Sequence, residues 1–406
     1  MDADYDLIVA GAGPAGSALA RFAGRAGLSV LLLDQARFPR EKPCGDTISS
    51  ASLALLDELG VLPELLRVPH VPVSRISYFA PDGESVTVPL PRVERAAPTA
   101  SLVCRRVLLD DVLLTAAREV AEVRDWTRVT HVLVEDGRAC GVRVDAGGGR
   151  ERTITCRLLA GADGARSRVA RDMGAPRTPR IRTLAARAYY RSVLGMQGCL
   201  EVHFLHETLP GFLWISPTES GLTNVGLAAP LDDAIRNRLK PRRALAAALA
   251  SDRLRERFEF AEAAGPAEVS LLPVGSPLRE IHGPGWLLVG DAAGLVNPCS
   301  AEGVANALLS AKVAAEVAAR ACAAGDFSAD ALGAYPYRLW KELAPGLRMA
   351  GRLLALRTPK AIGSLVRSAA RRPHNAAWIS GILLGSALPT EETEQLLSYL
   401  DFFSRG

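Results

Sequence analysis

The stretch YDLIVAGAGPAGSALARFAGRAGLSVLLLD, residues 5–34, decides the fold of this chain. Its apolar start predicts a strand over 5–10, the alanine-rich segment 17–26 predicts a helix, and 29–34 predicts a second strand. The turn before the helix reads GxGxxG, and its glycines allow a tight turn, close approach of the backbone to a pyrophosphate and close helix packing. Free N–H groups at the start of the helix attract phosphates. The stretch therefore predicts a βαβ unit that binds a dinucleotide.

An acidic residue completes this fingerprint. Asp34 ends the second strand, where a carboxylate can accept hydrogen bonds from ribose hydroxyls. FAD and NAD share these features, so the choice between them depends on residues further along the chain. The contacts predicted in this unit are Gly11, Gly13, Pro14, Ala15, Gly16, Asp34 and Gln35.

Two later segments resemble motifs of the FAD enzymes that include aromatic hydroxylases, flavin halogenases and geranylgeranyl reductases. Residues 161–167, GADGARS, resemble the second motif of this family, and residues 285–293, GWLLVGDAA, resemble the third, in which the Asp binds the ribityl chain. Arg106 matches the FAD-contacting arginine of the family. The resemblance implies FAD as the cofactor. The alternative for Asp163 is a purely structural Asp-Gly turn.

The segment after the third motif opens a long helix predicted over 303–324. N–H groups at the start of this helix could stabilise negative charge on reduced flavin. The further cofactor contacts expected from these segments are Arg106, Asp163, Gly164, Gly290, Asp291, Pro298, Glu302, Gly303 and Val304.

Two other segments resemble the geranylgeranyl reductase branch, which reduces isolated C=C bonds of prenyl chains. Residues 37–46, RFPREKPCGD, resemble its cysteine segment, and residues 209–217, LPGFLWISP, with 224–228 resemble the aromatic segment that lines its substrate cavity. This chain departs from that segment at Ser216, where Phe is usual, and at Ala228, where Gly is usual. The alternative is ordinary core packing for the aromatic residues and the thiol.

From this branch we predict the remaining site residues. The catalytic residues are Cys44 and Trp214; Cys44 and Gly45 also contact the cofactor; and the substrate contacts are Phe212, Trp214, Pro217 and Cys299. No spacing of His and Cys favours a metal site.

The predicted fold class is α/β, with a Rossmann-type FAD-binding domain, an interleaved mixed-sheet (α+β) substrate domain and C-terminal helices. Strand-like segments cover 71–91 and 183–227, and 232–257 is a charged helical stretch. From 335 onward the pattern is helical, with breaks expected at Pro345, Pro359, Pro373 and Pro389. The expected division is 1–70, 92–180 and 273–335 for the FAD-binding domain, 71–91 and 181–272 for the substrate domain, and 336–406 for the C-terminal helices.

Composition narrows the function classes. The chain has 406 residues, 49% of them hydrophobic, and a formal net charge of only +4, which gives no indication of nucleic-acid binding. Its seven cysteines form no CxxC pair, which argues against a disulfide framework and for a reducing compartment. The acidic start does not resemble a signal peptide, and no apolar run reaches the roughly 18 residues that span a bilayer. We therefore expect a cytoplasmic protein, with peripheral membrane contact as an option.

That option rests on the basic stretch between Glu342 and Glu391, which contains no acidic residue. Within it, Ile362, Leu365, Val366 and Ala369 lie at helical spacing opposite Arg367 and Arg371. This pattern indicates either a basic amphipathic surface for a membrane or a carrier protein, or a helix packed on the flavin domain with its charged face in solvent.

Three functions remain open at this stage. The first is reduction of a C=C bond of a hydrophobic prenyl or polyene/polyketide-type substrate, and the second is monooxygenation of a hydrophobic or aromatic metabolite. The third is flavin binding without catalysis, which the cysteine segment and Trp214 argue against. A halogenase is less favoured because no WxWxIP segment is present. No second GxGxxG in a βαβ context is visible, so NAD(P)H that docks transiently or a protein would donate the electrons. The sequence does not predict the oligomeric state.

Overall fold

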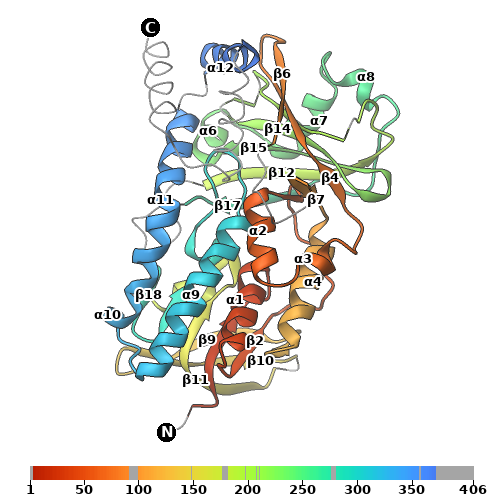
Figure 1. Cartoon of the computed structure of the whole chain (residues 1–406). Helices are drawn as coiled ribbons and strands as arrows, with labels where there is room; N and C mark the ends of the chain where they lie inside the picture. Colours follow the sequence, from red (N-terminus) through yellow and green to blue (C-terminus); the bar gives the residue numbers. More distant parts are fainter. Residues whose placement is uncertain are drawn as a thin grey trace.

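The computed structural model describes residues 3–90, 99–147, 149–175, 182–196, 198–206, 208–209, 211–275, 280–355 and 358–371. It confirms the predicted mixed α/β fold, with two large sheets and flanking helices (Figure 1). Several predictions lie outside the described residues. They are the helices beyond 371, the breaks at Pro373 and Pro389, Pro210 of the aromatic segment, and the end of the strand-like segment at Pro91.

The first sheet forms the lower half of the molecule in Figure 1. Its central strand β1 (Tyr5–Ala10) pairs in parallel with β2 and with β11, as expected for a βαβ unit. Leu7, Ile8 and Val9 are fully buried in a core cluster that also contains side chains of the helices packed on this sheet and of β10. The other strands are β2 (Val30–Leu33), β8 (Glu122–Arg124), β9 (Arg128–Glu135), β10 (Arg138–Asp145), β11 (Glu151–Gly161), β18 (His282–Gly283) and β19 (Trp286–Leu288).

Three helices carry the cofactor motifs against this sheet. They are α1 (Pro14–Arg25), α4 (Arg106–Arg118) and α9 (Val304–Ala324). Helix α1 packs against α4 on one side and α9 on the other. The three helices thus bring together cofactor motifs that are far apart in the sequence. Shorter helices flank this half: α2 (Ser50–Glu58), α3 (Leu62–Leu65), α5 (Arg168–Asp172) and α10 (Ala329–Leu332).

The second sheet forms the upper half of the molecule (Figure 1), and several of its apolar side chains are buried in one cluster. Strands β14 and β15 are antiparallel and place Trp214 opposite Gly226. The strands are β5 (Arg75–Phe79), β6 (Ser85–Pro89), β12 (Arg182–Arg191), β13 (Leu200–His203), β14 (Phe212–Pro217), β15 (Leu222–Pro230), β16 (Glu262–Ala263) and β17 (Glu268–Pro273).

The structure divides two of the predicted segments in this half. The predicted helical stretch 232–257 forms three short helices, α6 (Leu231–Arg236), α7 (Pro241–Leu249) and α8 (Arg255–Phe258), and Pro241 takes the first position of α7. Strand β4 (Val71–Val73) does not join the second sheet. It pairs with β7 (Ser101–Val103), which also pairs with β3 (Thr47–Ile48), in a small sheet between the halves. The domain boundaries given above remain a proposal.

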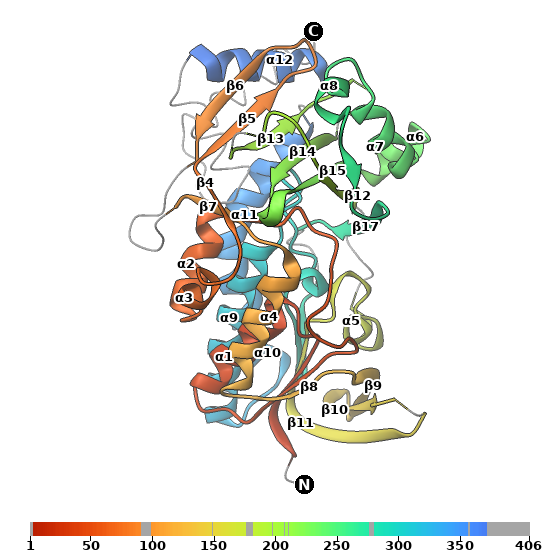
Figure 2. The same cartoon turned by 90° about the vertical axis from the view of Figure 1, so that its right-hand side faces the viewer.

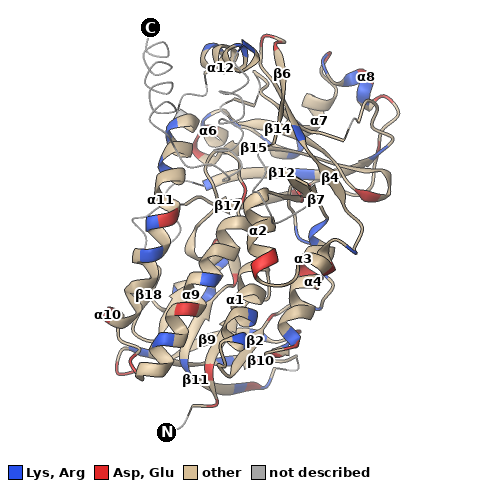
Figure 3. Ribbon diagram, in the orientation of Figure 1, with Lys and Arg blue, Asp and Glu red and all other residues tan. Residues whose placement is uncertain are grey.

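The C-terminal helices connect the two halves. Helix α11 (Ala334–Ala355) runs along one side of the molecule and continues through Pro345, so the expected break there is wrong. A proline removes one backbone hydrogen bond, but α11 packs along α9, and Ala344 and Leu347 on either side of the proline are buried. Lys and Arg recur along α11 (Figure 3). Among the described residues, no helix is long and apolar enough to cross a membrane.

The amphipathic stretch forms α12 (Pro359–Arg371), which lies across β6 (Figure 2). Its apolar side chains Ile362, Val366 and Ala369 are buried in the same cluster as Val88 of the second sheet. One alternative predicted that this helix packs on the flavin domain. That prediction is wrong, because α12 packs on the second sheet. Contact of its basic face with a membrane or carrier protein stays a prediction.

Candidate active site

The glycine turn after β1 has the geometry that a dinucleotide requires. Gly11 has φ +105°, and a Cβ added there would lie 2.4 Å from the carbonyl oxygen of Ala162. A Cβ on Gly16 would lie 1.7 Å from the carbonyl oxygen of Gly11, so only glycine lets α1 pack this close to the turn. Asp34 holds the turn from the end of β2, because its carboxylate accepts from the backbone N–H groups of Ala12 at 2.7 Å and Ala36 at 2.8 Å.

Two helices begin at one shared cavity. Helix α1 starts after Gly13 and α9 after Gly303, and neither N-terminus is capped by a side chain. Gly13, Pro14, Gly303 and Val304 line the same cavity, of about 220 Å³. Uncapped N–H groups and the positive ends of two helix dipoles favour negative charge there. These termini fit the phosphates and the electron-rich ring of reduced FAD.

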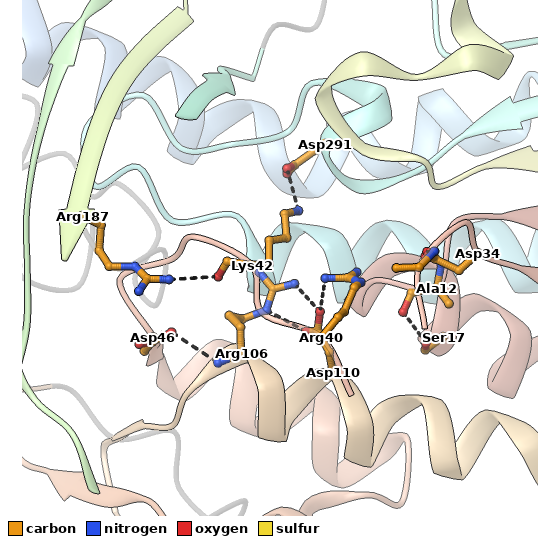
Figure 4. A network of polar contacts seen from close by, with 11 residues as sticks. Ala12, Ser17, Asp34, Arg40, Lys42, Asp46, Arg106, Asp110, Arg187 and Asp291 are labelled. Carbon is orange, nitrogen blue, oxygen red and sulfur yellow. Dashed lines mark hydrogen bonds and ion pairs between the residues drawn. The ribbon is translucent and has the colours of Figure 1, made fainter. Parts of the chain in front are cut away.

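Asp291 follows β19 and lies at the same cavity. Its carboxylate is 3.5 Å from the Nζ atom of Lys42, which reaches across from the cysteine segment (Figure 4). Its side chain is 22% exposed, so the carboxylate is accessible to a ligand. This position fits the predicted contact with the ribityl chain.

Arg106 lies at the start of α4, with its guanidinium tied to its own helix. Nε and Nη2 donate to the two carboxylate oxygens of Asp110 at 2.7 and 2.8 Å, and Arg40 approaches the same carboxylate at 3.2 Å (Figure 4). Burial raises the pKa of the neighbouring Cys44 thiol, and the charge of Arg106 offsets only part of this. Cys44 is therefore a neutral thiol at neutral pH.

Two predicted carboxyl groups are bound by nearby protein groups. Ser49 donates to Glu302 at 2.7 Å, and burial raises the pKa of Glu302 to about 7. Asp163 accepts from the backbone N–H groups of Arg168 and Val169 at the start of α5, which supports the structural alternative. Its other carboxylate oxygen, Oδ1, is buried.

The opposite wall of the cavity is apolar and comes from the second sheet. Phe212 and Trp214 lie there with ring centroids 6.1 Å apart, and the indole N–H of Trp214 donates to Asn224 at 3.0 Å. A Cβ on Gly226 would lie 2.2 Å from the indole, so this glycine makes room for the ring. Other members of this wall are Ile76, Tyr78, Leu200, Val202, Phe204 and Leu272.

The cavity brings many, but not all, of the predicted residues together. Those that line it are Gly13, Pro14, Ala15, Cys44, Gly45, Arg106, Gly164, Phe212, Trp214, Asp291, Cys299, Glu302, Gly303 and Val304. The predicted cofactor contacts that are not among the lining residues are Gly11, Gly16, Asp34, Gln35, Asp163, Gly290 and Pro298. Pro217 is buried at the end of β14, and Ser216 lines the cavity in its place. The role of each residue remains a proposal.

The sequence did not single out several residues of the cavity. Asp46 and Arg187 line it, and Tyr189 and Asn224 both donate to the Asp46 carboxylate. Asp46 ends the cysteine segment 37–46, and Asn224 begins the segment 224–228. Arg187 and Tyr189 lie two apart on β12, a spacing that puts them on one face of the strand but does not distinguish them from core residues.

The fold and site define an FAD-dependent oxidoreductase, since the glycine turn and two uncapped helix termini meet an apolar pocket. Residues 4–319 match the family model described as the FAD binding domain, and the chain belongs to this family. This match confirms FAD as the predicted cofactor.

Relatives and solved structures agree with this assignment. The chain is 32% identical over 410 residues to the menaquinone reductase of Mycolicibacterium smegmatis, covering 97% of this chain and 94% of that protein. It is 32% identical over 349 residues to the digeranylgeranylglycerophospholipid reductase 2 of Methanopyrus kandleri, covering 84% and 83%. These relatives confirm the predicted resemblance to the reductase branch.

Two solved structures share the fold. A geranylgeranyl bacteriochlorophyll reductase-like protein from Thermoplasma acidophilum superposes with a TM-score of 0.84 at 21% identity, covering 98% of this chain and 99% of that one. A flavin-dependent brominase superposes with a TM-score of 0.80 at 21% identity, covering 99% of each chain. At these identities the likeness shows the fold alone.

Proposed function

We propose that the chain reduces C=C bonds in the prenyl chain of a lipid or quinone. The observation that carries this proposal is the apolar wall around Trp214, which faces the cysteine segment across one cavity. The 32% identity to a menaquinone reductase and to a digeranylgeranylglycerophospholipid reductase supports it, because prenyl chains occur in the molecules that both names specify.

The residues of the cavity suit this chemistry. FAD, when bound and reduced, supplies hydride. The apolar wall would bind the hydrocarbon chain and exclude water, and the uncapped starts of α1 and α9 would hold the anionic parts of the cofactor. Ser216 and Ala228, the two departures from the branch pattern, both line the cavity, so we expect them to set the length or shape of chain that fits.

We also propose a source for the electrons that reduce the flavin. The sequence has one GxGxxG in a βαβ context, at residues 11–16, and that turn serves FAD. We therefore favour NAD(P)H that docks transiently, or a protein donor, over a built nicotinamide domain.

Anaerobic flavin kinetics test the function. We expect the photoreduced enzyme to be reoxidised by menaquinone in detergent micelles without O₂, and the rate to depend on the menaquinone concentration. The quinone ring can itself accept electrons, so a saturated-chain menaquinone serves as the matched control. Reoxidation that requires O₂ and passes through a hydroperoxide spectrum would establish a monooxygenase instead.

A further inference from the structure

A buried carboxyl group lies where the cofactor side of the cavity meets the apolar wall. Asp46 follows Cys44 and Gly45, lines the cavity and is only 1% exposed. Its φ is +61°, a backbone conformation that non-glycine residues adopt at a cost and that is frequent at functional sites. The surrounding contacts therefore hold this carboxyl group in place against its backbone preference.

These contacts come from three elements. The hydroxyl of Tyr189 donates to Oδ2 at 2.5 Å and the amide of Asn224 donates to the same atom at 2.6 Å. The backbone N–H of Arg106 donates to Oδ1 at 3.3 Å. Asn224 also accepts from the indole of Trp214, so the carboxyl group is linked through one residue to the apolar wall.

Tyr189 extends this network away from the cavity. It is partly exposed and is not among the residues that line the cavity, whereas Asp46 is. The guanidinium of Arg187 stacks 4.2 Å from its ring and fixes its orientation. Tyr189 therefore links Asp46, which lines the cavity, to a partly exposed position on β12.

The surroundings keep Asp46 available in its protonated form. Burial raises the pKa of Asp46 to about 6, and hydrogen bonds from Tyr189 and Asn224 offset only part of this effect. The charged and titratable groups that face it are Arg106 on α4, Arg187 and Tyr189 on β12, and the thiols of Cys44 and Cys104. A pKa of about 6 brings the titration of this carboxyl group close to neutral pH. The Cys44 thiol, whose pKa is raised, is a much weaker acid.

We propose that Asp46 donates the proton that completes reduction of the C=C bond, and that Tyr189 passes it a replacement from solvent. This inference rests on the proposed function. The π bond of the alkene breaks and two C–H bonds form, one with hydride supplied by reduced FAD and one with the carboxyl proton of Asp46. The O–H bond of Asp46 breaks, leaving a carboxylate that Tyr189 reprotonates, while the flavin is oxidised by two electrons.

Variants of the two residues test the path. A positioned general acid contributes about 10²- to 10⁴-fold, so Asp46→Asn is expected to slow single-turnover alkene reduction at least 100-fold. Asn tolerates a positive φ, so the backbone of this variant should be preserved. In wild type the rate should fall about tenfold per pH unit above pH 6, because only the protonated acid donates, and in Asp46→Asn this dependence should disappear.

Tyr189→Phe should slow steady-state turnover while Tyr190→Phe, the matched control, should not. Tyr190 lies next to Tyr189 on β12 but packs edge-on against Phe258 in a different cluster. Equal turnover of the two variants would overturn the role of Tyr189.

Infrared difference spectra of the oxidised holoenzyme give a readout independent of turnover. We expect a carboxylic acid band that is lost as pH rises through about 6 and is missing in Asp46→Asn. If wild type reduces the alkene and Asp46→Asn does so with the same rate and pH profile, this inference is overturned while the proposed function stands. Absence of alkene reduction by wild type would overturn the proposed function and this inference with it. Absence of the band would overturn Asp46 as the acid.

Discussion

Replacement of Asp291 by alanine is expected to weaken FAD binding about 10- to 150-fold. The carboxylate lies at the cavity near Lys42 and is partly exposed there. Loss of a charged acceptor at a desolvated site costs roughly 1.5–3 kcal/mol, which corresponds to this range in affinity. Titration of apoprotein with FAD, followed by flavin fluorescence, measures the dissociation constant.

Two control variants make this result specific. Asp291→Asn retains an acceptor oxygen and should lose less affinity than alanine. Asp252→Ala removes a carboxylate that is 96% exposed and pairs only with the nearby Arg255, so its FAD affinity should match wild type. An unchanged dissociation constant in Asp291→Ala would show that the ribityl chain is held elsewhere.

Trp214→Ala should slow substrate turnover about 100-fold while FAD binding changes little. The indole forms part of the apolar wall and comes from the second sheet, whereas the uncapped helix termini belong to the first half of the molecule. Small displacements from the geometry of attack can cost about 100-fold in rate. Single-turnover flavin reoxidation, FAD affinity and melting temperature should be measured on one preparation.

The loss of stability in Trp214→Ala distinguishes a residue that lines the substrate site from one that only fills the core. A buried Trp→Ala change in a core costs about 3–5 kcal/mol, and Trp286, which is 4% exposed in the first sheet, serves as that comparison. Trp214→Phe retains the ring but loses the N–H bond to Asn224. A large loss of melting temperature in Trp214→Ala with normal reoxidation would show that the indole only fills the core.

The local pattern around Gly11 was sufficient to predict the first half of the fold. Gly16 packs on Gly11, five positions away, and the strands before and after the helix carry the buried apolar runs 7–10 and 30–33. The helix through Pro345 was not predictable in this way, because contacts with α9 outweigh the local cost of proline. The partner of α12 was missed for the same reason, since an amphipathic pattern gives the buried face but not the surface that covers it.

The candidate site shows the same limit. Motif resemblance located Cys44, Asp291 and Trp214, all of which line the cavity. It did not show that Asp46 and Tyr189 meet, because they are 143 positions apart in sequence and only the pairing of β12 with β15 brings the tyrosine beside Asn224. The hydrogen bonds around Asp46 join elements that are far apart in sequence, so no residue spacing along the chain predicts them.

Mass spectrometry of the product tests the central claim most directly. Reduced holoenzyme should be incubated without O₂ with a menaquinone, and the lipid extracted and fragmented. We predict a gain of two hydrogen atoms per turnover, located in the prenyl chain and not in the ring. An unaltered chain, or a product that gains oxygen only when O₂ is admitted, would contradict reduction of a C=C bond by this protein.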